Sequence, residues 1–253
     1  MIFMEELLKF FLLFVVGLIA GFINVNAGGG STLTLPTLIF LGLDSAIANG
    51  TNRIGILLQN LFAVTSFRKQ DIHQFKESLK FSFITLPGAV IGALASVRIN
   101  DEWFQRILAI VMLGIVISMF LPQVKKNYQD VTSIVKNRWL IYIVLFFIGF
   151  YGGFIQVGVG FLLMAALYHI LKISLVYVNM HKVFIIMIYT IPSLLVFSLT
   201  GNVHWGFGLS LAFGNALGGW WGAKASVKGG EKLIRYVLAF AIALMAVKLL
   251  KLF

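Results

Sequence analysis

The sequence contains no cysteine, and only nine of its 253 residues are acidic. Without cysteine there can be no disulfide bond, no thiol nucleophile and no cysteine ligand for a metal. The acidic residues lie in loops, at the termini or at the expected ends of helices: Glu5, Glu6, Asp44, Asp71, Glu77, Asp101, Glu102, Asp130 and Glu231. Because no carboxylate falls well inside an apolar segment, the sequence argues against a sodium site built on Asp or Glu. We expect neither a metal nor a cofactor.

Charged residues of both signs are scarce. They make up 11% of the chain, whereas 60% of the residues are hydrophobic and the mean hydropathy is +0.96. Soluble domains carry about 25% charged residues, so we expect a multi-pass protein of the lipid bilayer with no separate soluble domain. The net charge of +11 comes mostly from Lys and Arg in short loops. Membrane topology is the ordinary explanation of such loops, and nucleic acid is not an expected partner.

Apolar segments recur along the chain, and most approach the ~20 residues that a helix needs to cross hydrocarbon. They are expected to be helices, because lipid cannot satisfy unpaired backbone groups. We expect them at about 7–23, 31–43, 46–67, 79–97, 104–121, 139–155, 160–171, 174–199, 205–223 and 233–252. Two of them, 31–43 and 160–171, are too short to span a ~30 Å core at about 1.5 Å per residue. We interpret these two as broken or re-entrant helices.

The sequence divides into two similar halves. Gly88–Ser96 (GAVIGALAS) matches Gly218–Ser226 (GGWWGAKAS) at five of nine positions, and the same shift of 130 places Asn49 on Asn179. The expected division is a first repeat at 1–122, a basic cytoplasmic linker at 123–138 and a second repeat at 139–253.

Charge in equivalent loops predicts the relative orientation of the halves. The loop after the third segment carries Arg68, Lys69, Lys76 and Lys80, whereas its counterpart after the eighth, TGNVH, carries neither Lys nor Arg. The positive-inside rule then places equivalent loops on opposite sides of the membrane. The predicted fold is an all-α polytopic membrane protein made of two inverted repeats, each of about five helical segments.

Each half contains a glycine-rich break, NVNAGGGST in the first and QVGVG in the second. Glycine often serves only to let membrane helices pack closely. Three consecutive glycines, Gly28 to Gly30, exceed what close packing needs and indicate an interrupted helix. Interrupted helices in matching positions of two halves are typical of the binding site of secondary transporters, near the midplane of the bilayer.

Each half also places one cation deep in an apolar segment. Arg53 lies eight or nine residues into the third segment, and Lys182 lies about eight residues into the eighth. A charge at the bilayer centre costs at least ~2.5–3.5 kcal/mol unless it is compensated, and no carboxylate is available within either segment. A transient anion is the preferred partner. The alternatives are that Lys182 snorkels to an interface and that Arg53 bonds to nearby carbonyls.

The candidate substrate site gathers these cations, the helix starts after the breaks and the adjacent polar side chains. Free N–H groups at a helix start favour negative charge. The predicted residues are Asn26, Gly28, Gly29, Gly30, Ser31, Thr32, Thr51, Asn52, Arg53, Gln156, His181 and Lys182. His181 could titrate near neutral pH and is the candidate for proton coupling. No catalytic residue is expected. Asp44 stands before Ser45, where we expect it to cap a helix.

At these residues the chain resembles the sulfite exporter TauE/SafE family, the TSUP permeases. The shared patterns of the first half are G-x-x-x-G, GGG, P-x-L-x-x-x-G and A-x-x-T, found here at Gly17/Gly21, Gly28–Gly30, Pro36/Leu38/Gly42 and Ala48/Thr51. The resemblance implies transport of sulfite, sulfonates or related small anions across the bacterial cytoplasmic membrane. The second half departs from the usual pattern, with His181–Lys182 in place of Thr or Ser, which leaves the substrate and the coupling ion open.

The preferred function is a secondary carrier for a small anion that works by alternating access. An anion channel would use the same site. An intramembrane enzyme is disfavoured, because the sequence has no HExxH, no GxSxG and no buried acid to act as a base. A scaffold without transport activity is the remaining alternative, and a homo-oligomer is compatible with all of these functions.

Overall fold

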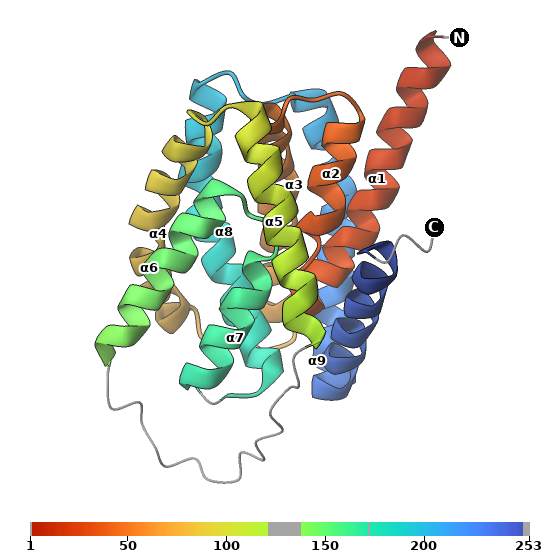
Figure 1. The fold of residues 1–253 in the computed structure, drawn as a ribbon. Coiled ribbons are helices and arrows are strands. Elements are labelled where there is room, and N and C mark those ends of the chain that lie inside the picture. Colours follow the sequence, from red (N-terminus) through yellow and green to blue (C-terminus); the bar gives the residue numbers. More distant parts are fainter. Residues whose placement is uncertain (1, 121–137, 172, 250–253) are drawn as a thin grey trace.

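The computed structural model describes residues 2–120, 138–171 and 173–249, and the regular elements of this part of the chain are all α-helices. In chain order they are α1 (Ile2–Ala27), α2 (Ser31–Phe40), α3 (Ser45–Arg68), α4 (Phe75–Ser96), α5 (Asp101–Phe120), α6 (Arg138–Phe154), α7 (Val159–Leu171), α8 (Leu175–Leu199) and α9 (Trp205–Leu249). They form one bundle (Figure 1). The all-α prediction is confirmed. The predicted linker at 123–138 lies almost entirely outside the described residues.

Helix length separates the elements into two groups. Three helices of the described chain are long and apolar enough to cross a membrane: Met4–Ala27, Phe75–Ser96 and Leu175–Leu199. By contrast, α2 has 10 residues and α7 has 13, which corresponds to roughly 15–20 Å at 1.5 Å per residue. The two short segments predicted from the sequence are therefore short helices that follow the glycine-rich breaks.

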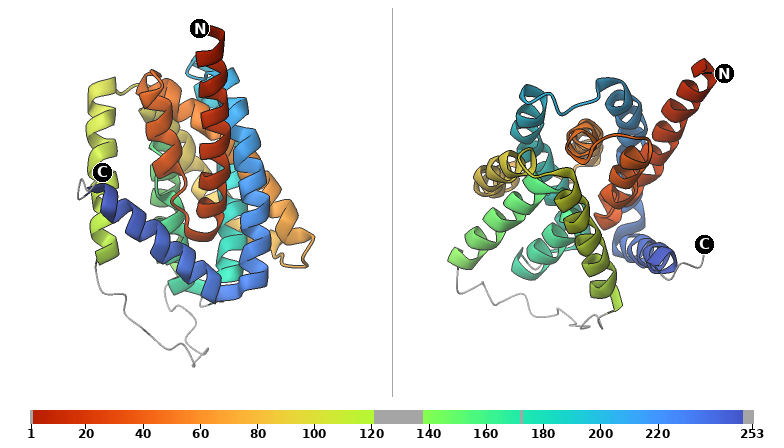
Figure 2. Two further views of the ribbon diagram at one scale, coloured as in Figure 1. Left: turned by 90° about the vertical axis from the view of Figure 1, so that its right-hand side faces the viewer. Right: turned by 45° about the horizontal axis from the view of Figure 1, so that its top comes forward.

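The last two predicted segments, 205–223 and 233–252, are joined in the structure. They form the two arms of α9, which bends at Gly230, where the backbone has φ 56° and ψ −156°. A positive φ is readily adopted by glycine, which has no Cβ. Figure 2 shows the second arm of α9 running back obliquely across the bundle.

Helix pairing joins the two halves of the chain. The first helix of the first half, α1, packs along α9, and the first helix of the second half, α6, packs along α4. Both pairs are close because glycines line them: a Cβ added at Gly153 would collide with the carbonyl oxygen of Ala89, and one at Gly21 with that of Asn215. Close backbone approach at small residues is the usual way that membrane helices associate.

The first helices of the two halves, α1 and α6, run in opposite senses. In Figure 1, α1 begins at the top of the view, whereas α6 begins at the bottom. Each of them pairs with a helix of the other half, since α9 belongs to the second predicted repeat and α4 to the first. This arrangement is what two inverted repeats would produce, and it favours that prediction without deciding where the repeats begin and end.

The expected capping role of Asp44 is wrong. Asp44 occupies the N-cap position of α3, but its side chain makes no capping hydrogen bond. Instead, the first backbone N–H of α3, from Ser45, donates to the carboxylate of Asp101 at the start of α5, at 2.6 Å. The cap is a tertiary contact between residues 56 positions apart in the chain, so local sequence could not reveal it.

Substitution of Gly153 tests the packing of α6 on α4. Gly153→Ala should destabilise the protein by about 1–3 kcal/mol, the usual range for overpacking. Gly114→Ala in α5 is the matched control, because a Cβ at Gly114 meets no atom within 4 Å. The midpoint of thermal unfolding in detergent should fall only for Gly153→Ala. An equal effect of both changes would contradict the packing described here.

Candidate functional site

The two glycine-rich breaks meet inside the bundle. After α1 ends at Ala27, Gly28 adopts a φ of +88°; after α6 ends, Gln156 and Gly158 adopt φ values of 63° and 73°. A Cβ added at Gly28 would collide with the backbone of Gly160, and one at Gly160 with the backbone of Gly28. The ends of α1 and α6 and the starts of α2 and α7 therefore converge on one point.

Arg53 of α3 reaches the break of the other half. Its guanidinium is fully buried and donates to the backbone oxygens of Gly152, at 3.2 Å, and Gly153. These carbonyls belong to the last turn of α6. The ring of Phe197, a residue of the second predicted repeat, lies 4.7 Å from Cζ of Arg53 and adds a cation–π contact.

Lys182 of α8 makes the reciprocal contact. Its Nζ donates to the backbone oxygens of Asn24, at 3.0 Å, and Val25, at 2.7 Å, in the last turn of α1. It also donates to Oδ1 of Asn179 at 2.9 Å and lies 3.5 Å from Sδ of Met164. With 1% of its surface exposed, Lys182 does not snorkel, and that alternative is wrong.

Each cation thus binds the C-terminal end of the interrupted helix of the opposite half. The last carbonyls of a helix have no intrahelical partner, and they form the negative end of the helix dipole, where a cation is stabilised. The ion pairs found among the described residues, those of Lys9 and Arg106, do not include Arg53 or Lys182. Arg53 and Lys182 are therefore hydrogen-bonded to carbonyls but not neutralised by a carboxylate. For Arg53, this is the carbonyl contact that the sequence left open as an alternative.

Two asparagines hold the cations in place from the same relative position. Nδ2 of Asn49 donates to Oγ of Ser96 at 2.9 Å, and Nδ2 of Asn179 donates to Oγ of Ser226 at 3.4 Å. Both members of the second pair lie 130 positions after those of the first. The opposite end of each amide, Oδ1, accepts from a cation, at 3.5 Å for Arg53 and 2.9 Å for Lys182.

Two further polar contacts lie beside the breaks. Nδ2 of Asn24 donates to Oε1 of Gln59 at 3.1 Å, and the hydroxyl of Tyr189 donates to Oε1 of Gln156 at 3.2 Å. Tyr189 is fully buried beside Gly152, which binds Arg53. Tyr189 was absent from the predicted site. The signal that could have found it is the repeat itself, because Tyr189 lies 130 positions after Gln59.

The polar groups predicted to await an anion at the first helix start have partners in the protein. The N–H of Gly30 donates to Oδ1 of Asn24 at 3.3 Å, and the hydroxyl of Thr32 donates to the oxygen of Gly29 at 2.6 Å. Oδ1 of Asn52 accepts from the hydroxyl of Thr34 at 2.7 Å. Ser31 is buried at the start of α2.

The remaining predicted residues are distributed around the breaks rather than on one surface. Nδ2 of Asn26 donates to the oxygen of Gly222 at 3.2 Å, so Asn26 faces α9. Thr51 accepts the backbone N–H of His204 at 2.8 Å. His181 contacts the start of α4: its Nδ1 is 2.8 Å from Oγ of Ser78, and its Nε2 is 3.1 Å from Oε1 of Gln74, the residue before the helix.

Comparison with known proteins gives matches over nearly the whole chain. The family model described as sulfite exporter TauE/SafE matches residues 13–249. Probable membrane transporter protein ORF9 of Sinorhizobium sp is 28% identical over 240 residues, which cover 94% of this chain and 91% of the relative. Probable membrane transporter protein YfcA of Escherichia coli K12 is 28% identical over 249 residues, 98% of this chain and 92% of the relative.

A more distant relative is the probable membrane transporter protein YunE of Bacillus subtilis, 23% identical over 267 residues, covering 96% of this chain and 98% of the relative. No solved structure gives a significant match. The relatives share the description of membrane transporter, which favours transport over catalysis and agrees with the apolar helices of the fold.

Removal of Asn49 tests how the site is held together. Nδ2 of Asn49 also donates to the backbone oxygen of Phe154 at 2.7 Å. Asn49→Ala would therefore leave both Oγ of Ser96 and this oxygen without their donor. A buried polar group that loses its partner costs about 1–3 kcal/mol, so the free energy of unfolding in mixed micelles should fall by that amount. Asn179→Ala should cost less, because its bond to Ser226 is longer. A loss below ~0.5 kcal/mol for Asn49→Ala would contradict this geometry.

Proposed function

The chain belongs to the sulfite exporter TauE/SafE family of membrane transporters, and from this premise we propose that it carries a small anion by alternating access. The proposed substrates are sulfite, an organosulfonate or a related sulfur-containing anion. The chain is a multi-pass membrane protein, so its substrate must cross through the bundle rather than around it.

One observation carries the choice of an anion: Arg53 and Lys182 are both buried, and no carboxylate of the described residues is found to bind either of them. The carbonyls of Gly152 and Val25 satisfy hydrogen bonds of Arg53 and Lys182, but a carbonyl bears only a partial charge. An anion that approached either cation to ~4 Å would gain about 4 kcal/mol at an effective dielectric constant of about 20. A cationic or neutral substrate would gain nothing from these charges.

Two unpartnered groups add to this preference. Seven buried side-chain atoms of the described chain have no hydrogen-bond partner, and the nitrogen atoms among them are Nδ2 of Asn52 and Nε of Arg53. Both are donors, and they belong to consecutive residues of α3. A buried donor without a partner is costly, and an oxygen of the proposed substrate would remove that cost.

The reciprocal contacts suggest how binding is coupled to movement. When a substrate attracts Arg53, the carbonyls at the end of α6 lose a hydrogen-bond donor. When it attracts Lys182, the carbonyls at the end of α1 lose theirs. Substrate therefore competes with the contacts that fix one half on the other. A ligand shifts a conformational equilibrium only by such a difference in its contacts between states.

An anion channel is the second candidate, because the same charges would serve a pore. Carrier and channel differ in a measurable way. In liposomes loaded with unlabelled sulfite, a carrier should accelerate the entrance of labelled sulfite and should saturate. Large unitary currents without such counterflow would favour the channel.

A new carboxylate beside Lys182 tests the proposed role of its charge. Oδ1 of Asn179 already lies 2.9 Å from Nζ, so Asn179→Asp would give Lys182 a fixed counter-ion with almost no change in shape. The protein should remain folded, but its affinity for the anion should fall at least tenfold, equivalent to about 1.4 kcal/mol. The measurement is thermal stabilisation of the purified protein by sulfite, sulfoacetate and taurine.

Asn100→Asp is the control for that change. It introduces the same charge at an exposed helix start, where a carboxylate can still accept the N–H of Trp103, and it should leave affinity unchanged. If Asn179→Asp binds the anion as tightly as the unmodified protein, the charge of Lys182 has no part in substrate binding. Its contacts with α1 would then be its whole role.

A further inference from the structure

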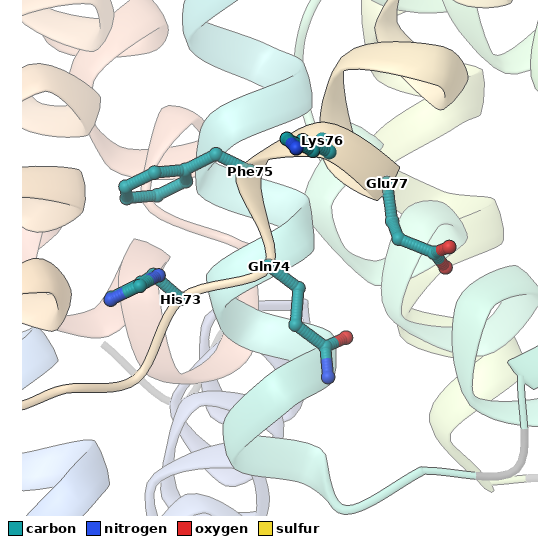
Figure 3. A pocket seen from close by; sticks show the side chains of 5 residues that line it. All are labelled: His73, Gln74, Phe75, Lys76 and Glu77. Carbon is teal, nitrogen blue, oxygen red and sulfur yellow. The ribbon is translucent and has the colours of Figure 1, made fainter.

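An open pocket lies at the end of the bundle where α3 passes into α4. It has a volume of about 570 Å³ and is lined by His73, Gln74, Phe75, Lys76 and Glu77 (Figure 3). Ligand pockets commonly have volumes of about 300–1,000 Å³, so a small anion with part of its hydration shell fits easily. Gln74 contacts His181 of the site described above, and none of these five lining residues was predicted to bind substrate.

Basic residues outnumber acidic ones in the segment around this pocket, where the acidic residues are Asp71 and Glu77. Arg68 and Lys69, at the end of α3, and Lys80, in the second turn of α4, are all exposed. Lys76 belongs to the lining itself. Figure 3 places the carboxylate of Glu77 on the far side of Gln74 from the ring of His73. The excess of basic residues attracts an anion in solution to this end of the molecule, because an excess of one sign of charge raises the local concentration of a ligand of the opposite sign.

The inner wall of the pocket touches the buried site. Gln74 is exposed, yet its Oε1 lies 3.1 Å from Nε2 of His181, a residue that is only 1% exposed. His181 immediately precedes Lys182 in α8. The contact between Gln74 and His181 thus joins the pocket to the part of α8 that bears Lys182.

Hydroxyl groups continue inward from this pair along α4. Ser78 contacts Nδ1 of His181, and Ser82 and Thr85 follow it at intervals of four and three residues, which places all three on one face of the helix. All three are fully buried. A buried polar face that continues from a solvent-filled pocket is what a route for a hydrophilic solute requires, because each hydroxyl can exchange its backbone acceptor for the solute.

An equivalent contact occurs in the other half of the chain. Thr51 of α3 lies 130 positions before His181, and His204 lies 130 positions after Gln74. Thr51 accepts the backbone N–H of His204 at 2.8 Å. The two contacts differ in kind: Gln74 and His181 meet through side chains, which can separate by rotation, whereas the Thr51 contact involves the backbone just before α9.

We propose that the pocket lined by His73–Glu77 is the vestibule through which a small oxyanion reaches Lys182 from the basic end of the bundle, and that Gln74 and His181 close its inner end. This inference rests on the proposed function. It adds the pocket where the anion first binds, the side from which the anion approaches, and two residues, Gln74 and His181, whose contact holds the vestibule closed.

The absence of cysteine makes this vestibule accessible to chemical labelling. Gln74→Cys supplies the only thiol of the chain, and two methanethiosulfonate reagents serve as probes, one with a sulfonate group and one with a trimethylammonium group. The sulfonate reagent should react at least about threefold faster than its cationic counterpart. Sulfoacetate should slow the reaction, and labelling should block transport.

Asn202→Cys is the matched control, because Asn202 lines a smaller pocket of about 210 Å³ together with Asp44 and Asp101. There the cationic reagent should react faster, and sulfoacetate should give little protection. Equal rates of the two reagents at Gln74→Cys, or labelling that leaves transport unchanged, would overturn the proposal. A protein that still binds sulfoacetate in the thermal assay would in that case retain the proposed function.

A pair of charge changes keeps the test independent of Gln74. Lys76 and Glu77 are both exposed lining residues. Lys76→Gln should raise the concentration of anion needed for half-maximal transport from the basic side, and Glu77→Gln should lower it, each by about two- to fivefold. If the two variants shift the half-saturating concentration in the same direction, or not at all, the pocket is not the vestibule.

Discussion

The structure depends on a reciprocal contact between two buried cations and two interrupted helices. Carbonyls at the end of a helix that stops inside a membrane have no water to bind and need a donor from elsewhere in the protein. A buried cation in turn needs acceptors for its hydrogen bonds. Arg53 meets the end of α6 and Lys182 the end of α1, so each half of the chain supplies the donor that the other half lacks. Neither half can end its first helix in the apolar interior without the other.

Packing and hydrogen bonding repeat this exchange around the breaks. The α1–α9 and α4–α6 pairs both join helices of different halves at closely spaced glycines, and the asparagines that bind the cations, Asn49 and Asn179, occupy equivalent positions. Two nearly equivalent arrangements in one chain give a simple physical basis for alternating access, because a conformational change at one end of the molecule has an equivalent change at the other end. The halves are not identical. One of the equivalent contacts joins two side chains, Gln74 and His181, whereas the other joins Thr51 to the backbone of His204.

Hydrophobic runs and residue spacing predicted much of this fold. The helices, the two short segments after the breaks and the burial of both cations follow from local composition and from the cost of charge in hydrocarbon. The partners of the cations did not follow, because Arg53 and Gly153 are 100 positions apart and meet only when the halves interlock. The cap of α3 did not follow either, because Asp101, which accepts the N–H of Ser45 in place of the predicted Asp44, is distant in the sequence. Tyr189 was missed because a buried tyrosine in an apolar helix has no local signature, although its position relative to Gln59 was readable from the repeat.

The most direct measurement of the central contact is the separation between Nζ of Lys182 and the carbonyl carbon of Val25. Solid-state NMR of protein in lipid bilayers, labelled with ¹⁵N in lysine side chains and ¹³C in valine carbonyls, can detect that dipolar coupling, and Val25→Ala assigns it. With Nζ 2.7 Å from the carbonyl oxygen, the account predicts a clear coupling in the absence of anion, which Val25→Ala removes. A spectrum without this coupling, or one that Val25→Ala leaves unchanged, would contradict the reciprocal contact on which the fold and the proposed transport both depend.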